Sequence, residues 1–140
     1  MKKILFFLLF VICAVFGYFG YQEYSKLLIC KADTENFTAK VTIKFEEDKP
    51  VWYKYKDEME FFGQIGTDSE FYYHSLNSKY DYLISEHKAV LTNSGNKIKT
   101  NIWYDFTKDS ESGDSLLLVG RNNTRESAKK KIESINYVCN

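Results

Sequence analysis

The sequence contains few of the residues on which catalysis and metal binding usually depend. Its 140 residues include one proline, two histidines and three cysteines. It has no Cys-x-x-Cys pair, no Gly-x-Ser-x-Gly nucleophile motif and no phosphate-binding glycine loop. His74 and His87 lack an identified third ligand for a metal. The sequence therefore predicts no metal, no cofactor and no catalytic residue, and it favours a protein that acts by binding.

Three acidic groups match known sites only in part. The loop from Asp109 to Asp114 alternates oxygen-bearing side chains ahead of a glycine, as a calcium loop does, but Gly120 stands where a bidentate Glu is needed. Carboxylates also gather at 46–48 and at 57–60, in the way that a glycosidase pair would. Because carboxylates in turns usually face water, we expect none of the three groups to be a site.

The chain also lacks an excess of either charge, with 19 basic and 19 acidic side chains. Without Lys2 and Lys3, the remainder has a net charge of about −2, which is too small to attract nucleic acid or anionic lipid over a distance. We therefore expect no nucleic-acid partner.

One long apolar run lies at the start of the chain. Residues 4–21 contain no charged residue, Asn, Gln or Pro, and they follow Lys2 and Lys3. About 18 to 20 apolar residues can span a bilayer, and basic residues in front of them orient the amino end toward the cytoplasm. Residues 1–21 are predicted to be a signal anchor at the inner membrane of a bacterial-type envelope, with residues 22–140 outside the cytoplasm.

A cleaved signal peptide is the main alternative. Cleavage needs small residues at two positions before the cut, and neither Ala14 nor Gly17 ends a segment that supplies both. A lipoprotein signal would use Cys13, but the residue before Cys13 is not small. With any of these signals the domain is exported, and cleavage would release it into the periplasm.

The exported part holds two cysteines, Cys30 and Cys139. Thiols oxidise in compartments outside the cytoplasm, so these two residues are predicted to form a disulfide. A disulfide that closes a loop of about 110 residues removes at most about 4 to 5 kcal/mol of unfolded-state freedom.

Strict alternation of apolar and polar residues predicts strands at 37–45 and 97–106. The turn at 46–50 joins the first of them to a strand at 51–56. Weaker patterns predict further strands at 59–65, 70–75, 79–86, 87–92 and 115–119. Helical spacing appears at 21–28 and at 124–134, where Thr124 is the expected cap, and residues 135–139 can close the sheet.

These elements predict one mainly β domain over residues 22–140, preceded by the apolar N-terminal helix. It is expected to have seven or eight short antiparallel strands and a short C-terminal helix. The strands are expected to form a barrel-like unit or a sandwich, and closure into a barrel is favoured because it hides the strand edges.

Aromatic residues supply the candidate contact surface. Trp52, Tyr72 and Trp103 stand outside the apolar alternation, and Trp and Tyr carry much of the energy at protein interfaces. We expect the domain to bind another envelope or secreted protein, without catalysis, as an inhibitor, an immunity factor or an accessory factor. The alternatives are a barrel that carries a small ligand or lipid, and an envelope hydrolase without a recognisable motif.

Overall fold

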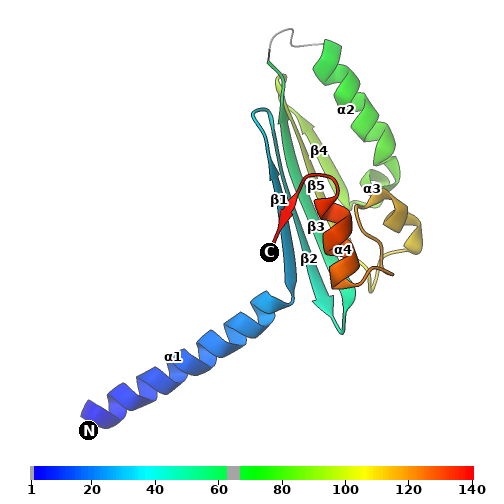
Figure 1. The fold of residues 1–140 in the computed structure, drawn as a ribbon. Coiled ribbons are helices and arrows are strands. Elements are labelled where there is room, and N and C mark those ends of the chain that lie inside the picture. The colour runs from blue at the N-terminus through cyan, green and yellow to red at the C-terminus, as the bar shows by residue number, and fades with distance from the viewer. Residues whose placement is uncertain (1, 63–66) are drawn as a thin grey trace.

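The computed structural model describes residues 2–62 and 67–140, which form a six-stranded antiparallel sheet with helices on one side (Figure 1). The strands follow the order β4-β5-β3-β2-β1-β6 across the sheet. In chain order the elements are α1 Lys2–Ser25, β1 Leu27–Asp33, β2 Phe37–Glu46, β3 Lys49–Glu60, α2 Thr67–Lys79, α3 Asp81–Ser85, β4 Ala89–Asn93, β5 Lys97–Asp105, the 3-10 helix η1 Glu111–Leu116, α4 Arg125–Glu133 and β6 Val138–Cys139.

The sheet is open, so the predicted barrel-like unit or sandwich is wrong, as is the count of seven or eight strands. β4 and β6 form the two edges. They are short, with five and two residues, and short edge strands limit unwanted pairing with other chains. One face of the sheet packs against α2, α3 and α4 (Figure 1). No helix of the described chain lies across the other face, which α1 reaches only at its end, where Glu23 contacts Lys44 at 3.5 Å.

The alternation in the two predicted strands decides which face is covered. In β2, Val41 and Ile43 are fully buried while Lys40 is exposed. In β5, Ile98, Thr100 and Ile102 are buried, while Lys99 and Asn101 are exposed on the other face. Successive side chains of a strand point to opposite faces, so one face of the sheet becomes apolar core and the other becomes polar.

Residues 67–85 form two helices where strands were predicted at 70–75 and 79–86. The side chains that turn toward the sheet recur every three or four residues, which is helical spacing. They are Ser69, Tyr72, Leu76, Tyr80 and Leu83. Aromatic residues favour strands in general, but this preference depends on context and here burial against the sheet outweighs it.

Three further predictions need correction. The strand predicted at 59–65 is the end of β3 followed by residues 61 and 62, and positions 63–66 lie outside the described residues. Residues 115–119 belong to η1 and an irregular segment, in which Leu117 and Val119 are buried. The helix predicted at 21–28 ends at Ser25, and β1 follows it.

The C-terminal helix and the disulfide are confirmed. The side-chain oxygen of Thr124 accepts a hydrogen bond from the Ser127 N–H at 3.2 Å, which caps α4 as predicted. Cys30 on β1 and Cys139 on β6 form the disulfide, with Cα atoms 4.1 Å apart and a sequence separation of 109. Cys13 on α1 is a free, exposed cysteine.

α1 leaves the sheet on the side opposite the helical layer (Figure 1). Its large apolar side chains are uncovered, with Phe10 74% and Phe16 73% exposed. Across residues 2–62 and 67–140, no helix combines the length and the apolar character needed to cross a membrane, so the predicted transmembrane helix has no support in this structure.

Candidate binding surface on the open face of the sheet

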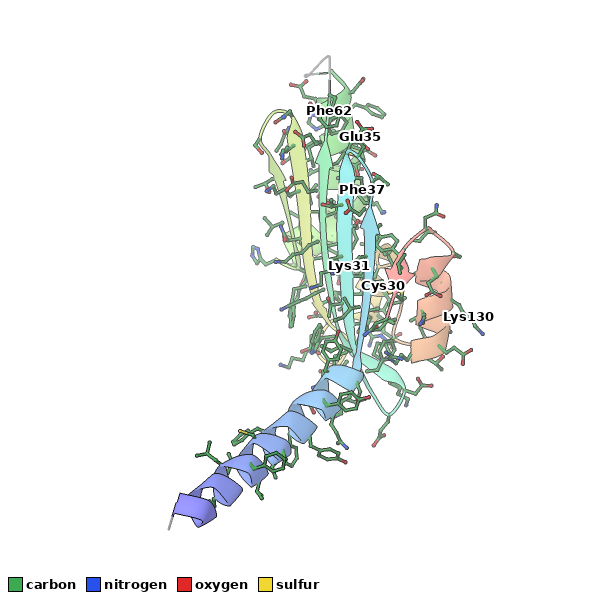
Figure 2. All side chains as sticks on the ribbon, turned by 60° about the vertical axis from the view of Figure 1, so that its left-hand side comes forward. Cys30, Lys31, Glu35, Phe37, Phe62 and Lys130 are labelled. Atoms are coloured by element: carbon green, nitrogen blue, oxygen red, sulfur yellow. A yellow bond between two sulfur atoms is a disulfide. The ribbon has the colours of Figure 1, made fainter. Side chains whose placement is uncertain are left out.

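The uncovered side of the sheet is a polar and aromatic surface, here called the open face. It is formed by the side chains of β1, β2, β3 and β5 that point away from α2, α3 and α4 (Figure 2). At its centre lie Ile29, Lys31, Lys40, Thr42, Trp52, Lys54, Lys56, Asn101 and Trp103.

Trp52 and Trp103 meet on the open face. Their rings stack with centroids 5.3 Å apart and planes inclined by 26°. Trp103 is 42% exposed and Trp52 is half-buried. The ammonium of Lys54, which lies opposite Trp103 in the β3–β5 register, sits 4.3 Å from the centre of the Trp103 ring. Stacking and the cation–π contact hold these rings in one arrangement before any partner binds.

Tyr72 lies elsewhere. It projects from α2, and its ring centroid is 5.6 Å from that of Phe61. Burial raises the pKa of Tyr72 to about 12. The structure therefore brings together two of the three predicted contact residues and places Tyr72 in the helical layer.

A row of three lysines crosses the open face beside the tryptophans. Lys31 pairs with Lys40 in the β1–β2 register, and Lys40 pairs with Lys56 in the β2–β3 register. Neighbouring strands lie about 4.8 Å apart, so the row places like charges side by side, which is unfavourable. In the part of the chain that the structure describes, none of the three lysines forms an ion pair. Figure 2 shows Lys31 on this face.

Carboxylates neutralise the lysines at the two ends of the open face. At one end, the carboxylate of Glu58 forms ion pairs with Lys99 at 2.9 Å and with Lys97 at 3.1 Å. Hydrogen bonds from these two lysines lower the pKa of Glu58, so it stays charged near neutral pH. At the other end, Lys44 contacts Glu46 at 3.0 Å. The charge left over therefore lies at the middle of the open face, on the lysine row and on Lys54 beside the tryptophans.

Two shallow hollows flank the row. One has a volume of about 250 Å³ and is lined by residues that include Thr38, Lys40, Lys56, Lys99 and Asn101. The other has a volume of about 200 Å³ and shares Lys56 and Asn101 with the first, but it extends to Trp103. Both are smaller than the roughly 300 to 1,000 Å³ of pockets that enclose small molecules. The open face is thus suited to side chains of a larger partner.

The acidic group at 57–60 is divided between the two faces. Asp57 lies on the covered face, where it accepts hydrogen bonds from the Tyr55 hydroxyl at 2.7 Å and the Thr100 N–H at 2.9 Å. Glu58 and Glu60 lie on the open face with Lys97. The structure does not bring these carboxylates together as an acid and base pair.

The other polar groups noted in the sequence are also separated. His74 is exposed on α2, and His87 is exposed in the turn before β4. Asp109 contacts Lys88 at 2.6 Å, and Asp114 contacts Arg121 at 2.8 Å. Within the described residues, no three His, Cys, Asp or Glu side chains are placed to hold a metal ion.

The Asp114 pair leads to a prediction about pH. Burial opposes ionisation of Asp114, but the side-chain and backbone N–H groups of Arg121 outweigh it and lower the pKa of the carboxyl. Because this pKa lies below the usual value of 3.8, the pair contributes stability that is present above about pH 4 and lost as the pH falls through the folded-state pKa. We expect the unfolding free energy of Asp114→Asn, from urea titrations between about pH 6 and pH 2.5, to fall less on acidification than that of the wild type. An identical acid slope in the two proteins would contradict this role.

The lysine row is the main feature that the sequence did not reveal. Balanced charge over the whole chain hides a local concentration of lysines. One sequence signal does point to lysines on the open face: they recur at every second residue on the polar side of a strand, as at positions 54 and 56. The neighbourhood of Lys31, Lys40 and Lys56 also required the strand order β1-β2-β3, which alternation does not supply.

Comparisons with known proteins bear on the fold. No family model and no curated protein matches the chain. The NMR structure of the E. coli YehR protein is similar, with a TM-score of 0.56 and 13% sequence identity over 81% of this chain and 89% of that one. The NMR structure of a protein from Streptococcus pneumoniae TIGR4 gives a TM-score of 0.44 at 12% identity over 81% and 84%. At such low identity the likeness to YehR concerns the fold alone.

Proposed function

We propose that the chain is a non-catalytic binding domain of the cell envelope that acts on another protein, as an inhibitor, an immunity factor or an accessory factor. The observation that carries the proposal is the stacked Trp52–Trp103 pair on a sheet face that no helix of the described chain covers. Residues of this type dominate the binding energy of protein interfaces. A pair that is already held in place also loses little freedom on binding.

The N-terminal segment supports export of this domain. The apolar run that begins at Ile4 in the sequence continues through the exposed side chains of α1, which include Phe10, Phe16 and Phe19. An uncovered apolar surface of this length is unfavourable in water and favourable in lipid. The disulfide fits an oxidising compartment. We propose an inner-membrane anchor with the domain in the periplasm or outside, and secretion after cleavage as the alternative.

The proposal predicts a loss of binding without a loss of stability. Trp103→Ala is expected to reduce capture of the envelope partner at least tenfold in a pull-down, because a central Trp commonly contributes about 2 kcal/mol or more to an interface. Its midpoint of thermal unfolding should stay within about 3 °C of the wild type, since the ring is 42% exposed. Trp52→Ala should weaken capture in the same direction.

Phe71→Ala is the matched control. Phe71 lies on α2, on the helical side of the sheet, and is 78% exposed. Its removal deletes an exposed aromatic ring of the chain but leaves the open face intact, so capture should be unchanged. Full capture by both tryptophan variants would refute the proposal. A fall of more than about 8 °C in the unfolding midpoint of Trp103→Ala would show that the pair is structural instead.

A further inference from the structure

We infer that the partner binds the open face through an acidic segment, with its carboxylates on the lysine row formed by Lys31, Lys40 and Lys56. This inference rests on the proposed function and specifies the chemistry of the partner. It assigns the row a role that the stacked tryptophans alone do not supply, which is selection by charge.

The charges of the molecule itself provide the first argument. Many lysines of the described chain lie 2.6 to 3.9 Å from a carboxylate of the same chain, namely Lys26, Lys44, Lys88, Lys97, Lys99, Lys108, Lys129 and Lys130. The three lysines of the row have no such neighbour among the described residues, and the same holds for Lys49, Lys54, Lys79 and Lys131. What distinguishes the row is that its three unpaired lysines stand opposite one another in the strand register. Departures from the usual pairing rules concentrate at functional sites. Carboxylates from a partner would remove the repulsion within the row.

The surroundings of the row provide the second argument. Glu58 also lines the hollow of about 250 Å³ between Lys40, Lys56 and Lys99, but its carboxylate is already paired with Lys97 and Lys99. The same hollow presents the hydroxyl of Thr38 and the amide of Asn101. These groups can donate hydrogen bonds to carboxylate oxygens. The hollow next to it leads to Trp103. The open face therefore offers neighbouring places for an acidic side chain and for an apolar one.

The size of the basic area favours a protein segment over a membrane surface. An anionic bilayer is broad and would meet the whole open face. The row is bounded by the exposed Asp33 at one end of the face and by Glu46, Glu47 and Asp48 in the β2–β3 turn at the other. Carboxylates at both borders repel an extended anionic surface but leave room for a segment a few residues wide.

Tryptophan fluorescence reports on this face alone, because the two tryptophans of the chain are Trp52 and Trp103. The full chain is held in neutral detergent micelles and titrated with an octaglutamate peptide that carries one terminal leucine. We expect a saturable change in emission whose apparent affinity falls as sodium chloride rises from about 50 to about 300 mM, since salt screens exposed charges. Replacing Lys31, Lys40 and Lys56 together by Gln should weaken binding at least fivefold.

A second triple variant tests whether position matters. Lys79→Gln, Lys130→Gln and Lys131→Gln remove the same charge from α2 and α4, and this protein should bind octaglutamate as the wild type does. All six lysines are exposed, so both variants are expected to fold. Absence of any response to octaglutamate, or equal weakening by both variants, would overturn the inference. So would a response to phosphatidylglycerol vesicles without one to octaglutamate, because the face would then bind a membrane.

The pull-down separates this inference from the proposed function. If the tryptophan variants lose the partner while the row variant still captures it in full, the proposed function stands and the acidic segment is refuted. Capture that does not depend on either tryptophan would refute the proposed function itself. The complete prediction is that the tryptophan variants and the row variant all lose the partner. The segment of the partner that can be cross-linked to the open face is expected to be rich in Asp and Glu.

Discussion

Replacing Cys30 and Cys139 together by alanine is expected to lower the free energy of unfolding by about 3 to 4 kcal/mol. The disulfide joins β1 to β6 and closes a loop with a sequence separation of 109. Without it, the unfolded chain gains the freedom that the closed loop removed. A typical domain is stable by roughly 5 to 15 kcal/mol, so a loss of this size is a large part of the total.

Urea titrations of the full chain in neutral detergent measure this loss, and Cys13→Ala is the matched control. Cys13 is free and exposed on α1, so its replacement should leave the unfolding midpoint of the domain unchanged. A loss below about 1 kcal/mol in the double variant would show that the disulfide contributes little to the fold. Equal effects of the double variant and of Cys13→Ala would contradict the expectation as well.

Ile132→Ala is expected to destabilise the domain by about 3 kcal/mol. Ile132 is fully buried between α4 and the sheet, together with Ala128. Truncation removes apolar contacts and leaves a cavity, which makes such changes more costly than the loss of hydrophobic transfer alone. α4 would lose much of its attachment to the covered face.

Ile135→Ala separates burial from residue type. Ile135 follows the end of α4, and 48% of its surface is exposed. The same truncation should therefore reduce the unfolding free energy by less than about 1 kcal/mol, measured by the same urea titrations. Similar losses in the two variants would mean that α4 is not packed on the sheet as described.

The strands with strict alternation could be predicted from the sequence, and so could the helix with a clear cap. In β2 and β5, Val41 and Ile102 belong to repeating apolar positions that define one buried face without help from distant residues. α4 begins at a Thr whose side chain caps it. The strand predicted in place of α2 is wrong for a local reason: Tyr72 and its aromatic neighbours favour strands in general, but the positions that the sheet buries there recur at helical spacing.

Closure of the sheet could not be predicted in the same way. Alternation of apolar and polar residues predicts that one face of each strand is covered, but it does not predict whether a second sheet or a layer of helices covers it. Here α2, α3 and α4 cover the sheet, and β4 and β6 remain as edges. The misassigned segment at 67–85 accounts for the error, because strands in that place would have supplied the missing part of a barrel.

The candidate site was predictable in part for a related reason. The outward orientation of Trp52 and Trp103 follows from alternation, but their contact depends on the register between β3 and β5. Tyr72 was misplaced together with α2. The lysine row depends on three strands being neighbours, and a residue pattern within one strand does not contain that information.

Site-specific photo-crosslinking in cells that make the protein tests the central claim most directly. A benzophenone amino acid at Asn101, an exposed position on the open face between Lys56 and Val90, should form a covalent adduct with one envelope protein. The same probe at Asn77, an exposed position on α2, should form none with that protein. Adducts of the envelope protein from Asn77 but not from Asn101 would contradict binding through the open face.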